Sequence, residues 1–297
     1  ELIAQGQISP VELLEACIER IETVNPSINA VTAKCYDRAR VEARAAEQAV
    51  RRGEPLGLLH GLPLGVKDLE PTAGLLSTFG SPNYRNNIPS QDIELVARLR
   101  RAGAIVTGKT NVPEMGAGAN SRNPVWGATG NPFNPNLNAG GSSGGSAAAL
   151  ATDMLPVCTG SDTGGSLRIP AAKCGVVGLR PSPGVVPSVR KLLGWTPISV
   201  VGPMGRTVDD ACLQLARQAS RPCATPSRLH AAHSGTPPAH TPALGAYAGL
   251  CRPLTSFLPL PPSPPRPAHR ARTRSGRVGN QPRPTTSSYS ADSTRPS

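Results

Sequence analysis

Residues 138–170 read NAGGSSGGSAAALATDMLPVCTGSDTGGSLRIP, with one glycine–serine cluster on either side of a short apolar stretch. The clusters are GGSSGGS at 140–146 and GSDTGGS at 160–166. Glycine has no Cβ, so such runs allow positive φ angles and close approach of the backbone to a ligand. Serine hydroxyls beside exposed backbone N–H groups suit acyl transfer, which needs a nucleophile and oxyanion donors within about 3 Å of one carbonyl. The segment therefore indicates a catalytic serine.

A flexible Gly/Ser linker is the alternative interpretation of this segment. It fits poorly, because residues 147–151 and 155–157 are apolar and the run RIPAA that begins at Arg168 is typical of packed structure. The pattern G-x-S-x-G also occurs twice here, centred on Ser142 and on Ser143. A nucleophile elbow needs a histidine later in the fold. The four later histidines all follow residue 218 and His60 precedes the serines, so we expect a different base.

Lys67 is the best candidate for that base. It ends the apolar run HGLPLGVK at 60–67, which predicts a buried strand, in a chain with five lysines and 26 arginines. A buried lysine has a lowered pKa and can accept a proton. The alternative is a lysine that reaches solvent from a strand end. Strand alternation directs Val66 and Asp68 to the face opposite Lys67, so Asp68 need not be its ion-pair partner.

The net charge of +12 is concentrated at the C-terminal end of the chain. Residues 219–297 hold ten arginines, one acid and 15 of the 33 prolines, in runs such as PLPPSPPRP at 259–267. Such a composition cannot form a core. We therefore predict a domain over 1–218, as the N-terminal part of a larger domain, and a disordered Pro/Arg/Ser-rich tail over 219–297. Because the domain itself is nearly neutral, it is not expected to bind nucleic acid.

Residues 103–110, GAIVTGKT, match the phosphate-binding pattern G-x-x-x-x-G-K-[ST]. That loop normally follows a strand and opens a helix. Here a helix is predicted before it, over 92–101, and its own residues 104–107 are strand-like. Pro113 also interrupts the helix start that should hold the phosphate. We therefore predict no nucleotide site at this position.

Helix signals mark both ends of the predicted domain. The sequence SPVE at 9–12 predicts a capping box, with an apolar helical face continuing to Val24 and an end at Asn25-Pro26. A second helix is expected over 36–52, and short strands at 28–32 and 176–179. Thr207 is expected to cap a last helix, with Asp210 at its third position, that ends near Gln218.

The seven cysteines form no C-x-x-C pair, which favours a reducing, cytoplasmic location. Cys17, Cys158 and Cys212 lie in apolar surroundings and are expected in the core. No apolar run is long enough to span a bilayer, so no membrane partner is expected.

Four pieces of the chain together resemble the amidase signature family of serine hydrolases. They are GVKD at 65–68, GGSSGGS at 140–146, GSDTGGSLRIP at 160–170 and GPMGRT at 202–207, in the family's order. The resemblance covers most of residues 1–218. It implies an α/β fold, with a mixed sheet covered by helices on both faces. It also implies hydrolysis of a small-molecule amide through an acyl-enzyme, without cofactor or metal, and leaves a homodimer open.

The resemblance assigns roles to particular residues. Ser166 would be the nucleophile, Ser142 a bridging serine held by a cis peptide, and Lys67 the terminal base. The oxyanion donors would be the N–H groups of Thr163, Gly164, Gly165 and Ser166. Asp162 and Arg168 would support their loop. Two turn serines are the alternative interpretation of Ser142 and Ser166.

Two features depart from the family pattern. Lys173 stands where the family usually has an aromatic residue, and is expected to put a charge near the core behind the nucleophile loop. The family's domain also continues beyond the equivalent of Gln218. A general amidase, a glutaminase like the A subunit of glutamyl-tRNA(Gln) amidotransferase, and a truncated non-catalytic fragment all stay open.

Overall fold

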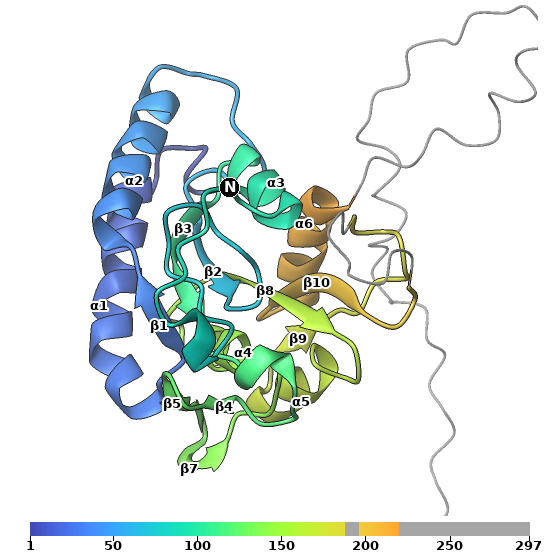
Figure 1. Cartoon of the computed structure of the whole chain (residues 1–297). Helices are drawn as coiled ribbons and strands as arrows, with labels where there is room; N and C mark the ends of the chain where they lie inside the picture. Colours follow the sequence, from blue (N-terminus) through green and yellow to red (C-terminus); the bar gives the residue numbers. More distant parts are fainter. Residues whose placement is uncertain (188–195, 220–297) are drawn as a thin grey trace, which may run out of the picture. The chain divides into compact units, whose positions relative to one another are not determined.

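The computed structural model describes residues 1–187 and 196–219 (Figure 1). A mixed six-stranded sheet forms its centre, in the order β1-β3-β2-β8-β10-β9. Strands β2 and β8 run parallel to one another, β3 runs parallel to β2, and the remaining pairs are antiparallel. The strands are β1 (Val31–Lys34), β2 (Pro63–Lys67), β3 (Ile105–Thr110), β8 (Val157–Asp162), β9 (Val177–Gly178) and β10 (Val200–Gly205).

Helices cover both faces of the sheet. On one face the core joins α4 (Gly144–Ala151) and α5 (Arg168–Cys174) to the inward residues of β8 and β10. On the other, α3 (Glu94–Arg101) and α6 (Val208–Gln218) contribute to a core that contains Leu64 and Val66 of β2. A third cluster joins α1 (Pro10–Ile28) to α2 (Tyr36–Arg51). The expected α/β architecture is confirmed.

Close packing explains why α4 begins with glycines. All of its residues from Gly144 to Leu150 are buried. A Cβ on Gly145 would lie 2.2 Å from the backbone nitrogen of Asn111, at the end of β3. Only glycine therefore allows the start of α4 to reach the sheet so closely. This contact fixes where the preceding serines lie.

Short elements connect these layers. Two small hairpins pair β4 (Arg122–Asn123) with β5 (Gly127–Ala128), and β6 (Gly130–Asn131) with β7 (Asn134–Asn138). Two single 3₁₀ turns, η1 (Pro82–Tyr84) and η2 (Glu114–Gly116), complete the described elements.

The start of α1 was predicted correctly and its end was not. Ser9 and Glu12 form the capping box, and Thr207 and Asp210 form another at α6, which ends at Gln218 as expected. However, α1 continues through Pro26 to Ile28. Proline removes one helical hydrogen bond, yet the N–H of Asn29 still reaches the carbonyl of Asn25 at 2.7 Å. The strand expected at 28–32 accordingly begins later, at Val31.

The phosphate-loop pattern lies in the sheet. Residues Ile105–Thr110 form one buried strand, so GKT continues β3 instead of opening a helix. The ammonium group of Lys109 donates hydrogen bonds to the backbone oxygen of Glu70 and, at 3.1 Å, to the hydroxyl of Thr72. A buried lysine held in this way is not placed to bind phosphate.

Lys173 is exposed, which corrects the expectation of a charge near the core. It lies on the outer side of α5, between the buried residues Ala171 and Cys174, and contacts Asn138 at 3.3 Å. The helix turns this position outward because successive positions on a helix point in different directions.

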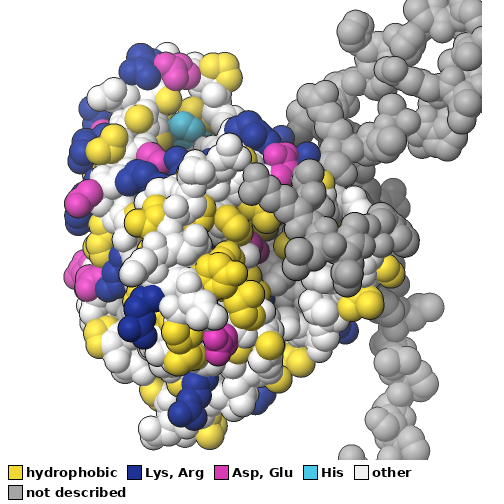
Figure 2. All heavy atoms as spheres, viewed as in Figure 1, with side chains coloured by type: hydrophobic (Ala, Val, Ile, Leu, Met, Phe, Trp, Pro, Cys, Tyr) yellow, Lys and Arg dark blue, Asp and Glu magenta, His cyan; other side chains and the backbone are white. Residues whose placement is uncertain are grey.

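Acidic and basic side chains are interspersed over α1 and α2 (Figure 2). Arg40 pairs with Glu15 at 2.7 Å, which ties α2 to α1. Among the described cysteines none forms a disulfide; Cys17 and Cys158 are buried as expected, whereas Cys212 is half-buried. Within the described ranges, no helix is long and apolar enough to cross a membrane. Apart from Ala219, the predicted tail over 219–297 lies outside the described residues.

Candidate active site

The site lies where β2 and β8 end beside the start of α4. Parallel neighbours β2 and β8 bring Lys67 and Ser161 to the same edge of the sheet. The loop before α4 brings Ser142 and Ser143 over that edge. The backbone N–H of Lys67 donates to the hydroxyl of Thr159 at 2.9 Å, which fixes the end of β2 against β8.

Lys67 is buried and surrounded by serine hydroxyls. Its Nζ atom lies 2.7 Å from Oγ of Ser142, 2.8 Å from Oγ of Ser143 and 2.9 Å from Oγ of Ser161. None of its surface is exposed. The alternative in which Lys67 reaches solvent from a strand end is therefore excluded.

Burial also determines the charge of Lys67. Desolvation disfavours its ammonium form and lowers the pKa of Lys67 to about 7, although Glu70 and Asp162 act in the opposite direction. Asp68 faces away, as alternation predicted, and its carboxylate accepts hydrogen bonds from the N–H and hydroxyl of Thr78. An amine that titrates near neutral pH can exchange a proton with a neighbouring hydroxyl.

Ser142 is buried and lies next to a constrained stretch of backbone. The Gly141–Ser142 peptide bond is cis. A Cβ on Gly141 would lie 2.8 Å from the backbone nitrogen of Asn120, so the loop at 118–120 packs directly against it. This packing holds the Ser142 hydroxyl over Lys67.

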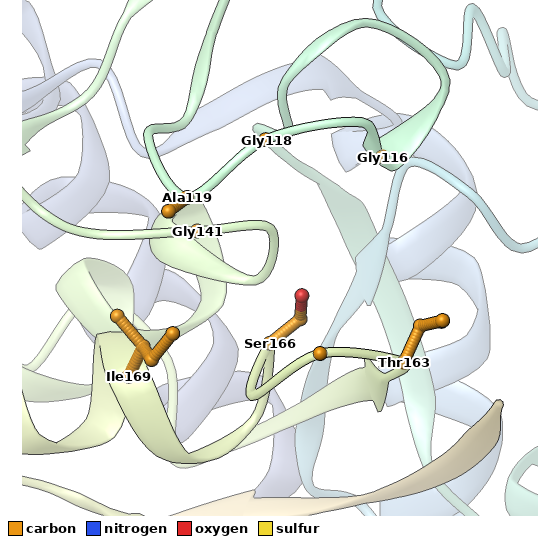
Figure 3. Close-up of a pocket in the computed structure, with 8 residues that line it drawn as sticks. Gly116, Gly118, Ala119, Gly141, Thr163, Ser166 and Ile169 are labelled. Atoms are coloured by element: carbon orange, nitrogen blue, oxygen red, sulfur yellow. The ribbon is translucent and has the colours of Figure 1, made fainter. Parts of the chain in front are cut away.

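Ser166 lines a cavity of about 170 Å³. Figure 3 shows its hydroxyl directed into this space, with Ile169 on one side and Thr163 on the other. The backbone oxygen of Ser166 accepts a hydrogen bond from the N–H of Ser143 at 3.3 Å, which joins the two glycine–serine clusters. In the described part of the chain, the hydroxyls of Ser142 and Ser166 are not hydrogen-bonded to one another. The remaining lining residues are Gly116, Gly118, Ala119, Gly141 and Gly164.

Asp162 organises the loop between β8 and α5. Its buried carboxylate accepts hydrogen bonds from the N–H groups of Gly165 at 2.8 Å and Leu167 at 3.1 Å. It also pairs with Arg168 at 3.0 Å and Arg180 at 2.9 Å. Burial acts to raise the pKa of Asp162, but the hydrogen bonds from Arg168 and the backbone outweigh it and hold that pKa well below its usual range.

These contacts show that the four candidate oxyanion donors are not equally available to a ligand. The sequence suggested Gly165 as an oxyanion donor, but its N–H already donates a hydrogen bond to Asp162 and is therefore not free for a ligand. Thr163, Gly164 and Ser166 line the cavity. We therefore retain these three as the candidate donors.

Several site residues were not recognised in the sequence. Ser143 and Ser161 contact Lys67, and Arg180 binds Asp162 while it also donates to the carbonyl of Ile198 at 2.9 Å. Alternation along β8 places Thr159 and Ser161 on one face, but it cannot identify the residue opposite them. Arg180 follows a two-residue strand and has no sequence signal of its own.

Comparison with known proteins identifies the family. A family model described as Amidase matches residues 12–234. The chain belongs to the amidase signature family. This family member is 43% identical, over 218 residues, to an acylamidase of Rhodococcus erythropolis. It is 41% identical, over 215 residues, to the A subunit of glutamyl-tRNA(Gln) amidotransferase of Acaryochloris marina. Each alignment includes 72% of the present chain.

Solved structures place this amidase family member in the same fold. A bacterial aryl acylamidase of the amidase signature enzymes matches 74% of the chain with a TM-score of 0.71 and 38% identity. A 6-aminohexanoate cyclic dimer hydrolase in complex with substrate matches 76% with a TM-score of 0.68, also at 38% identity. The chain spans 46% of each of these structures, 45% of the acylamidase and 44% of the amidotransferase polypeptide.

Proposed function

We propose that this chain hydrolyses a carboxylic amide through an acyl-enzyme formed on Ser166. The observation that carries the proposal is the 2.7 Å contact between buried Lys67 and Ser142, beside a cavity that Ser166 lines. A lysine near its pKa, a hydroxyl that can relay a proton and a serine facing open space are the parts that nucleophilic catalysis requires. The similarity to the Rhodococcus erythropolis acylamidase supports the same reaction class.

Acylation would begin with neutral Lys67. Ser142 gives its proton to Lys67 Nζ and takes the proton of Ser166, whose oxygen forms a bond to the carbonyl carbon of the amide. The negative charge moves to the carbonyl oxygen, where N–H groups of Thr163, Gly164 and Ser166 would stabilise it. When the C–N bond breaks, Ser142 returns a proton to the leaving amine and Lys67 becomes neutral again.

Deacylation would use the same groups with water in place of the amine. Water gives a proton to Ser142, its oxygen bonds to the acyl carbon, and the ester bond to Ser166 breaks. The proton returns to the Ser166 oxygen and the carboxylic acid leaves. Each proton is returned, so no metal or further cofactor is needed to balance the two steps.

The cavity lining favours an uncharged substrate. Its eight residues are glycines, Ala119, Ile169, Thr163 and Ser166, and none has a charged side chain. Among the described residues of this lining, no side chain can pair with the charged amine and carboxylate of glutamine. A glutaminase like the amidotransferase is the second candidate, because the identity to that relative is nearly as high. Ammonia release from glutamine, compared with aniline release from an aryl amide, separates the two.

Reaction with a fluorophosphonate tests the proposal, since this probe labels activated serines. We expect the chain to be labelled, and Ser166→Ala to abolish labelling. Ser27→Ala, a change at an exposed helix position, is the control and should label normally. Equal labelling of Ser166→Ala and the unmodified chain would refute the assignment. A folded chain that never labels would establish the non-catalytic alternative. A cytoplasmic location and a homodimer stay predictions.

A further inference from the structure

Glu70 is a buried carboxyl that the mechanism above does not use. It lies in the turn after β2, where its N–H donates to the backbone oxygen of Lys67 at 3.0 Å, and only 2% of its surface is exposed. An isolated buried carboxylate is unfavourable unless a charge or hydrogen bonds compensate it. Its presence in the turn that directly follows the candidate base therefore calls for a physical explanation.

Thr159 connects Glu70 to Lys67. The threonine hydroxyl accepts the hydrogen bond from the backbone N–H of Lys67 at 2.9 Å and donates its own proton to Oε2 of Glu70. The other carboxylate oxygen, Oε1, is buried and has no hydrogen-bond partner among the described residues. Oε2 is thus bound to Thr159 of β8, whereas the cost of burying Oε1 can be offset only by nearby positive charge.

Two buried lysines can provide that charge. Lys109 donates to the backbone oxygen of Glu70, and its charge acts on the Glu70 carboxyl together with that of Lys67. Burial raises the pKa of Glu70 to about 7, into the range where Lys67 titrates. When two ionisable groups interact in this way, their titrations are coupled and the apparent pKa values belong to the pair.

Other titratable groups also act on Lys67, Glu70 or Lys109. Asp162 on β8 also favours the ammonium form of Lys67. Lys109 on β3 interacts with acidic and thiol groups in addition to Glu70, namely Asp68, Asp92 and Cys35. The thiol of Cys158 on β8 also experiences the charge of Glu70, but burial raises its pKa, so it stays neutral. Glu70 is the acidic group that acts most strongly on Lys67.

We propose that Glu70 is a positioning residue that sets the protonation of Lys67, because its carboxylate, held on Thr159 behind the lysine, stabilises the ammonium form. The catalytic meaning of this inference rests on the proposed function. The charge coupling between Glu70 and Lys67 is independent of that function. The pH at which the base becomes neutral then depends on Glu70, a residue outside the cavity.

Glu70→Gln tests this directly, because glutamine keeps the shape and removes the charge. The chain has five lysines, so lysine side-chain NMR of the full chain can follow each amine, with Lys67→Met assigning the Lys67 signal. We expect Glu70→Gln to lower the pKa of Lys67 by about 1 pH unit. The pH limb of fluorophosphonate labelling should move downward by the same amount. A merely structural role for Glu70 would change neither midpoint.

Asp68→Asn is the matched control. Asp68 is another buried carboxyl next to Lys67, but it faces Thr78 and interacts with Lys109. We expect this variant to move the Lys109 titration and to leave that of Lys67 unchanged. A Lys67 pKa that responds to Asp68→Asn as much as to Glu70→Gln would overturn the specific role of Glu70.

The two proposals fail in different ways. If labelling does not depend on Ser166, the proposed function fails, while the NMR titration still decides the role of Glu70. An unchanged Lys67 pKa in folded Glu70→Gln overturns the inference whatever the labelling shows. Should that variant not fold, the NMR titration of the Glu70 carboxyl carbon in the unmodified chain tests the inference instead. The inference requires its signal to titrate over the same pH range as Lys67, and independent transitions refute it.

Discussion

The Nζ atom of Lys67 lies 2.7 Å from the Oγ atom of Ser142, although the two residues are 75 positions apart in the chain. Lys67 ends a strand in the middle of the sheet, and Ser142 belongs to the loop before α4. The contact therefore depends on how closely α4 packs onto β2 and β3. It gives the buried amine a hydroxyl with which to exchange a proton.

The first prediction concerns the pH dependence of acylation. Only neutral Lys67 accepts a proton, and burial lowers its pKa to about 7, so labelling should rise through neutral pH and level off above it. Lys67→Ala should slow labelling by about 100-fold or more. Lys67→Arg should not restore it, because the guanidinium stays protonated. Timed labelling across pH measures this, and substantial reactivity of the arginine variant would contradict the base role.

The second prediction concerns Asp162 and stability. Asp162→Ala leaves the N–H groups of Gly165 and Leu167 without their acceptor and removes the ion pairs with Arg168 and Arg180, so it should cost about 1–3 kcal/mol in the free energy of unfolding. Asp37→Ala, at a fully exposed carboxylate, is the control and should change little. Urea unfolding at pH 7 measures both. A loss no larger than that of the control would show that Asp162 does not hold its loop together.

The pKa of Asp162 also predicts a pH dependence of stability. Its folded-state pKa lies below the value of about 3.9 for an unfolded aspartate, so its stabilising contribution is complete above that value. The contribution is lost as pH falls below about 4 toward the folded-state pKa. The stability difference between the unmodified chain and Asp162→Asn should therefore shrink in strong acid and stay constant near neutral pH.

The third prediction concerns the start of α4. Gly145→Ala places a Cβ 2.2 Å from the backbone nitrogen of Asn111, which cannot move independently of the sheet. We expect a loss of about 1–3 kcal/mol in unfolding free energy, and slower labelling because Ser142 shifts with α4. Gly164→Ala is the stability control, since its Cβ would meet nothing within 4 Å. Thermal and urea unfolding measure both variants, and equal losses for Gly145→Ala and Gly164→Ala would show that packing at the start of α4 is unimportant.

The fourth prediction concerns the capping box of α1. Ser9 accepts hydrogen bonds from the N–H groups of Val11 and Glu12, so Ser9→Ala should cost about 1 kcal/mol. The exposed Ser27, near the other end of α1, makes only a local bond to Val24. Ser27→Ala should therefore cost less. Equal losses in urea unfolding would mean that the cap does not stabilise the folded state.

Local signals explain which elements could be predicted. The capping boxes at Ser9 and Thr207 depend on residues within four positions, so the sequence contains all of their parts. The prediction that α1 ends at Pro26 was wrong because the sequence rule describes a preference, whereas the last turn needs only the bond from Asn29 to Asn25. Lys173 was misplaced because its outward direction depends on the rotation of α5 against the sheet.

The resemblance to the amidase signature family implied the α/β class, whereas the sequence by itself determined the helix starts, the buried strand that ends at Lys67 and the two glycine–serine clusters. Periodicity, capping and glycine content are local properties of the chain, and they specify these features without knowledge of any partner. Only the tertiary structure decided that Ser143 and Ser161 share the lysine, that Arg180 binds Asp162 and that Glu70 lies behind the base. Those contacts depend on strand order and on the depth at which α4 packs, because alternation along a strand determines the face of a residue and not its neighbour.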